Sequence, residues 1–117
     1  MELSKSQKKI ARQLISKALQ RECKTFLEEV KDVLPLRDQT PHEVYLNLYK
    51  KITDFDKHIA TQYDRLSGSR YFMAVFSLFY NNVLTEDDIK LFNEEVQQNL
   101  MVMKQNWDLD SPGNQSH

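Results

Sequence analysis

Apolar residues recur in steps of three and four along nearly the whole chain, and this spacing is the feature that most constrains the fold. It places the apolar residues on one side of an α-helix, whereas a half-buried strand would alternate apolar and polar residues. Glycine occurs twice and proline three times in 117 residues, which is few turn residues for a sheet protein. The sequence therefore predicts an all-α fold.

Four segments carry the helical pattern. They are expected from about Lys5 to Leu34, from Pro41 to about Leu66, from about Arg70 to Val83, and from Glu86 to about Trp107. The third segment is apolar on nearly all sides, which favours a buried position. The connections are short, which favours antiparallel neighbours. We therefore expect a four-helix up-down bundle with a long first helix and a short central apolar third helix.

Capping signals mark the ends of these segments. Thr40 and Glu43 have the spacing of a capping box, with Pro41 in the first helical position. Thr85 is expected to cap the fourth segment, whose acidic first turn complements the helix dipole. Gly68 and Ser69 fit the end of the second segment and the start of the third.

The length suits one domain, which we expect over residues 1–107, with a disordered C-terminal tail over 108–117. No apolar run is long enough for a membrane span, and the first twenty residues lack the apolar core of a secretory signal. The single cysteine, Cys23, cannot form an internal disulfide. These observations predict a cytoplasmic protein that does not enter a membrane.

The sequence contains no recognisable catalytic motif and no set of three or four metal ligands with suitable spacing. Cys23 lies in an apolar stripe, which is typical of an inert, partly buried thiol. Asp54 and His58 share one helix face, but a metal needs three or four such ligands. We therefore predict no catalytic residue, no metal and no cofactor, and an enzyme is the less favoured class.

The densest polar cluster lies between the second and third segments. Ser67, Gly68, Ser69 and Arg70 offer backbone N–H groups, two hydroxyls and a guanidinium, which suit a phosphate or carboxylate. Asp64 precedes this run, and His58 lies about two helical turns earlier. The same residues also suit a helix end followed by a helix start that binds nothing. An anion or small-ligand site is one hypothesis.

Basic residues crowd the first segment. Lys5, Lys8, Lys9 and Arg12 would form a partial stripe able to contact nucleic-acid phosphates. The net charge is −1 and the isoelectric point is about 6.3, which is low for a dedicated nucleic-acid-binding domain. A solvated helix face explains the same residues, so nucleic acid is the less favoured partner.

The first segment also carries an apolar stripe that needs cover. Its candidate interface residues are Ile10, Leu14, Ile15, Ala18 and Leu19. If the short third helix does not cover them, a second copy or another protein would; packing in the core of the same chain is the alternative. The leading interpretation is a small helical interaction, assembly or regulatory module that self-associates as a homodimer.

Overall fold

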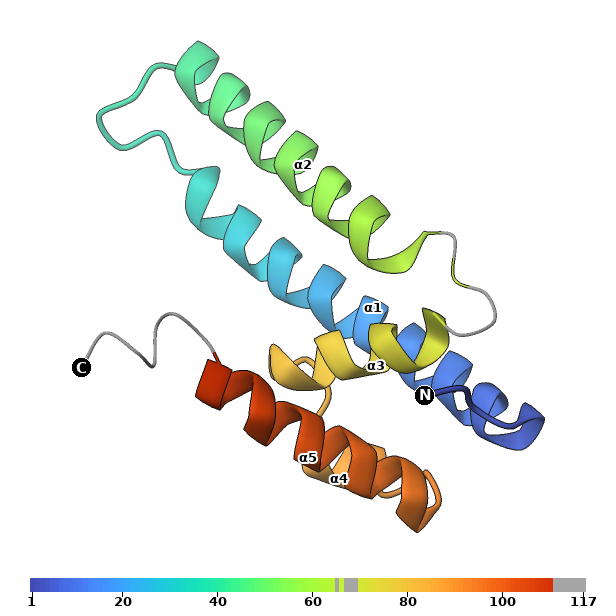
Figure 1. The fold of residues 1–117 in the computed structure, drawn as a ribbon. Coiled ribbons are helices and arrows are strands. Elements are labelled where there is room, and N and C mark those ends of the chain that lie inside the picture. The colour runs from blue at the N-terminus through green and yellow to red at the C-terminus, as the bar shows by residue number, and fades with distance from the viewer. Residues whose placement is uncertain (65, 67–69, 111–117) are drawn as a thin grey trace. The chain divides into compact units, whose positions relative to one another are not determined.

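The computed structural model describes residues 1–64, 66 and 70–110, and all regular elements within those residues are helices (Figure 1). The elements are α1 (Lys5–Val33), α2 (Pro41–Tyr63), α3 (Arg70–Tyr80), α4 (Glu86–Ile89) and α5 (Glu94–Asp110). The all-α prediction is confirmed. The expectation of four helices is not met, because the described residues form five, which do not make a clear four-helix up-down bundle.

The chain forms two compact units, and α1 contributes to both. The first, which we call the core unit, contains Met1–Ala18 together with the described residues from Leu66 onward. The second, which we call the hairpin, contains the described residues of Leu19–Arg65, and therefore the rest of α1 and all of α2. Nearly all buried apolar side chains in the described chain belong to the core unit; the exception is Val44.

Helix α3 supplies much of the interior of the core unit. Six of its eleven residues are buried: Phe72, Ala74, Val75, Phe76, Leu78 and Phe79. Helix α5 covers part of this surface, because the Trp107 ring lies 5.7 Å from the Phe76 ring between centroids. The Lys104 ammonium lies 4.7 Å from the centroid of Phe79, a cation–π contact. The nearly all-apolar sequence of α3 is thus explained by its burial.

The prediction of one continuous helix from Glu86 to Trp107 is wrong. Helix α4 ends at Ile89, and α5 begins at Glu94. Asn93 causes the new start, because its side-chain oxygen accepts a hydrogen bond of 2.9 Å from the N–H of Val96, as in an N-cap. The N–H of Asn93 donates in turn to the side-chain oxygen of Gln7, at 2.9 Å. This hydrogen bond to Gln7 of α1 therefore stabilises the break between α4 and α5.

Helix α3 ends at Tyr80, earlier than the predicted Val83. Asn82 has a φ of 64°, the left-handed conformation that follows many helix ends. The N–H of Val83 donates to the carbonyl of Leu78, and the N–H of Asn82 donates to the carbonyl of Phe79. This is the Schellman arrangement, here built on asparagine instead of glycine.

In the hairpin, α1 and α2 run antiparallel and are joined by residues 34–40 (Figure 1). The predicted capping box of α2 is confirmed: Glu43 N–H donates to Thr40 Oγ1, and Thr40 N–H donates to the Glu43 carboxylate. Helix α2 ends at Tyr63, before the predicted Leu66. Gly68 and Ser69, predicted at the end of the second helix and the start of the third, lie outside the described residues.

None of the helices in the described parts of the chain is both long and apolar enough to cross a membrane.

Two neighbouring aspartates test the packing of α4. Asp88 is buried, accepts from the N–H and hydroxyl of Thr85, and lies 3.1 Å from Lys17 Nζ. Asp88→Ala is expected to lower the free energy of unfolding by about 2 kcal/mol, because it removes a helix cap and a charged hydrogen-bond acceptor together. Asp87→Ala is the matched control, since Asp87 is exposed and its carboxylate pairs with the exposed Lys90. Urea unfolding followed by circular dichroism measures both; equal effects of the two changes would contradict this account.

Candidate functional site

The residues predicted for an anion site are divided between the two units and the residues that the structure does not describe. Ser67, Gly68 and Ser69 lie outside the described residues. Arg70 is the exposed first residue of α3 and belongs to the core unit, while Asp64 and His58 belong to the hairpin. The anion-site hypothesis therefore stays a prediction.

His58 instead contributes to a polar cluster between the two helices of the hairpin. Its Nε2 donates to one carboxylate oxygen of Glu22 at 2.6 Å, and the hydroxyl of Tyr63 donates to the other oxygen, also at 2.6 Å. The Glu22 side chain is only 15% exposed. A half-buried carboxylate that accepts two short hydrogen bonds from α2 fixes the pairing of α1 with α2. The cluster is a structural clamp between the helices.

The position of Tyr63 in this cluster changes the pKa of its phenol. Burial raises the pKa of its phenol well above the ordinary value, and the hydrogen bond to Glu22 and the negative charge of that residue raise this pKa further. The reason is that ionised Tyr63 would place a second negative charge beside Glu22 in a poorly solvated position.

Tyr63 therefore makes the hairpin sensitive to alkali. In the unfolded chain the phenol ionises near its ordinary pKa of about 10, whereas in the folded chain it keeps its proton. Its contribution to stability is present below about pH 10 and is lost as the pH rises further. We expect Tyr63→Phe to flatten the decline of the free energy of unfolding between about pH 9 and pH 11, measured by urea titration at several pH values. Tyr49→Phe, at an exposed position of the same helix, should leave the decline unchanged; a Tyr63→Phe curve parallel to wild type would contradict the assignment.

The predicted interface residues of the first segment are mostly interior. Leu14, Ile15 and Ala18 are buried in the core unit, whereas Ile10 and Leu19 are partly exposed. Leu14 has only 1% of its surface exposed, so a charged residue there would disrupt the core itself. The substitution Leu14→Glu thus tests folding and does not test association.

Two of the four residues of the predicted basic stripe contact other side chains of the core unit. Lys8 pairs with Glu2 at 3.7 Å. Arg12 donates to the hydroxyl of Tyr71 at 3.3 Å, and its guanidinium lies 5.3 Å from the centroid of that ring. Lys5 and Lys9 are exposed on the same helix. Half of the predicted phosphate contacts are therefore already engaged within the core unit.

The hairpin exposes large apolar side chains along α2 and along the second half of α1, up to Leu34 just after the end of α1. On α2, Tyr45, Tyr49 and Ile52 are 60%, 63% and 48% exposed. On the other side of the turn, Leu27 and Leu34 are 61% and 52% exposed. We call these five residues, together with the partly exposed Cys23, the apolar face of the hairpin.

These residues lie on one side of the hairpin because of helix geometry. Each of them directly follows a residue on the inner side of its helix: Leu27 follows Phe26, which stacks on Phe55 at 4.1 Å, and Ile52 follows Lys51, which pairs with Glu29. One residue turns a helix by about 100°. In an antiparallel pair the two rotations run in opposite senses when viewed from one end, so both steps lead to the same side.

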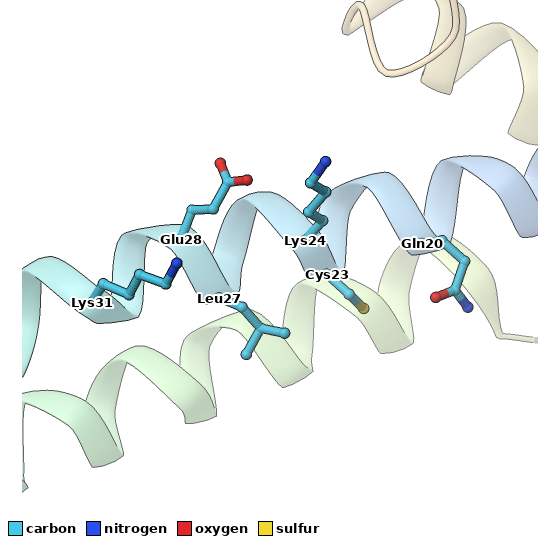
Figure 2. Close-up of a pocket in the computed structure, with 6 residues that line it drawn as sticks. All are labelled: Gln20, Cys23, Lys24, Leu27, Glu28 and Lys31. Atoms are coloured by element: carbon cyan, nitrogen blue, oxygen red, sulfur yellow. The ribbon is translucent and has the colours of Figure 1, made fainter.

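Figure 2 shows the α1 part of this surface. Cys23 and Leu27 extend to one side of the helix, and Lys24 and Glu28 extend to the other. Together with Gln20 and Lys31, these residues line a shallow hollow of about 370 Å³. All six lie on α1, so the hollow is an open depression along one helix and not an enclosed cavity.

The apolar face carries charged side chains such as Lys24 and Glu28 beside its apolar residues. Catalytic and small-ligand sites bring several polar groups together in a concave pocket. Glu22, an acceptor near the face, is already engaged by His58 and Tyr63. Across residues 1–64, 66 and 70–110, no group of three or more His, Cys, Asp or Glu side chains is arranged to hold a metal ion.

Comparison with known proteins finds no matching family model, no matching curated protein and no matching solved structure.

Sequence reasoning missed Tyr45 and Tyr49 as surface residues of interest. The apolar stripe of the second segment runs through Val44 and Leu48, and each tyrosine lies one residue after a member of that stripe. The signal was present as aromatic residues four apart, which share a helix face of their own. Only the structure shows that this second face is left exposed.

Proposed function

We propose that this chain is a helical interaction module that self-associates through the apolar face of the hairpin. The observation that carries the proposal is the contrast between the two units. The core unit holds nearly all of the buried apolar side chains and also exposes several large ones, among them Trp107 and Leu109. The hairpin buries only Val44 among its described apolar residues, and it exposes Leu27, Leu34, Tyr45, Tyr49 and Ile52. A contiguous exposed apolar surface of this kind marks a protein-interaction site.

Burial supplies the driving force for such an association. Each square ångström of apolar surface removed from water contributes about 25 cal/mol. Two helices alone have little interior, and isolated helices are only marginally stable in water. A second copy laid on the apolar face would bury the surface that the hairpin by itself leaves in water. Exposed tyrosines suit this role, because they combine a large apolar ring with a hydroxyl that tolerates solvent.

Alternative functions draw less support from the structure. Nucleic-acid binding through Lys5, Lys8, Lys9 and Arg12 is disfavoured, because Arg12 is engaged with Tyr71 and Lys8 with Glu2. The cytoplasm is the location we propose for the assembly, and the lone Cys23 of the sequence supports it.

Association can be measured directly. Size-exclusion chromatography with light scattering is expected to give twice the chain mass of 13.9 kDa at high protein concentration, and dissociation on dilution. Leu27→Glu is expected to raise the dissociation constant at least tenfold, because it places a charge in a desolvated apolar contact.

Leu91→Glu is the matched control, because Leu91 is 59% exposed but belongs to the core unit. It should leave the dissociation constant unchanged. A wild-type chain that stays monomeric at every concentration would reject the proposal, and so would equal effects of the two glutamates.

A further inference from the structure

The contacts within the hairpin define which residues of its helices lie level with one another. Glu22 meets His58, Phe26 meets Phe55, and Glu29 meets Lys51. In each of these pairs the two residue numbers add up to 80 or 81. A residue of α1 therefore lies level with the residue of α2 for which the two numbers again add up to 80 or 81.

This register makes the apolar face complementary to a copy of itself. Leu27 lies within two residues of the level of Ile52, and Leu34, just after α1, lies within two residues of the level of Tyr45. Lys24, beside the face on α1, lies level with Asp56 on α2. Neither Lys24 nor Asp56 forms an ion pair with another residue in the described part of the chain.

We propose that two copies pack face to face about a twofold axis parallel to the hairpin helices, so that α1 of each copy lies on α2 of the other. This inference rests on the proposed self-association and specifies its geometry. A rotation about such an axis keeps every residue at its own height. Leu27 then meets Ile52 of the second copy, and Lys24 meets Asp56 of the second copy. The result is an antiparallel four-helix assembly built from two hairpins.

Charge distinguishes this arrangement from the other twofold packing. An axis perpendicular to the helices would place α1 on α1 and α2 on α2, which keeps Lys24 of one copy away from Asp56 of the other. Only the α1-on-α2 arrangement offers each Lys24 this aspartate. The Lys31 position then lies level with Tyr49 of the second copy, where an ammonium can lie over an aromatic ring.

The exposed area is sufficient for a specific dimer. An aromatic side chain presents about 150–250 Å² and an aliphatic one somewhat less, so five residues at 48–63% exposure offer on the order of 500 Å² per copy. Two copies together would bury about 1,000 Å², the lower bound for a specific interface. We therefore expect a concentration-dependent dimer and not an obligate one.

Cross-linking between two single-thiol proteins tests the arrangement. Both carry Cys23→Ser; one adds Leu27→Cys and the other Ile52→Cys, and one bears a mass tag so that the three linked species separate on a gel. They are mixed at a concentration where the dimer forms and treated with a short bis-maleimide. The α1-on-α2 arrangement predicts mixed Leu27→Cys with Ile52→Cys products in clear excess over both self-linked products.

Charge reversal gives an independent test that does not depend on new thiols. Lys24→Asp and Asp56→Lys should each raise the dissociation constant several-fold, and the double variant should restore it, because the pair is re-formed between copies with its signs exchanged. The control double variant exchanges Lys50 and Asp54, which pair at 2.7 Å within α2. It should leave the dissociation constant unchanged.

The outcomes separate this inference from the proposal beneath it. A chain that never dimerises overturns both. A dimer that Leu27→Glu disrupts, but in which the Leu27→Cys protein cross-links mainly to itself, keeps the proposed function and overturns the α1-on-α2 arrangement. Additive losses for Lys24→Asp and Asp56→Lys, without restoration in the double variant, would also overturn it.

Discussion

Two helices packed side by side have no interior, since each buries only the strip that faces the other. This constraint governs the part of the chain formed by the second half of α1 and by α2. Phe26 and Phe55 stack in the strip between the helices, yet the residues one step further around each helix remain in water. They include Leu27, Tyr45, Tyr49 and Ile52, so the sequence places apolar surface where a lone hairpin cannot bury it. The proposed function follows from this mismatch between composition and available cover.

The core unit shows the opposite solution to the same problem. Helix α3 is apolar around most of its circumference and is buried accordingly. Polar contacts fix the packing: Lys17 pairs with the buried Asp88, and Gln7 accepts from the backbone of Asn93. Because these contacts link residues that are distant in sequence, they specify one packing of α1 against the segment that contains α4 and α5. Helix α1 thus has an interior role in its first half and a surface role in its second half.

Polar residues in the hairpin set the geometry on which any assembly depends. Glu22 binds His58 and Tyr63 at once, and Glu29 binds Lys51, so the two helices are held in one register. A fixed register gives the apolar face a fixed pattern of side chains. Specific association needs such a pattern, because apolar burial alone is not directional. The contacts of Glu22 therefore fix the arrangement of the side chains on the apolar face.

The sequence by itself determined the helical class, the first residues of α1, α2, α3 and α4, and the caps at Thr40 and Thr85, because these depend on residues within a few positions of one another. It also indicated that the third helix is buried. The break before Asn93 required the distant side chain of Gln7, and the early end of α3 depended on a left-handed asparagine where glycine is the usual signal. Periodicity shows that a helix has an apolar face, but it does not show which segment covers that face. Tertiary structure alone decided that Leu14 is interior while Leu27, on the same helix, faces solvent, because burial is set by contacts between segments remote in sequence.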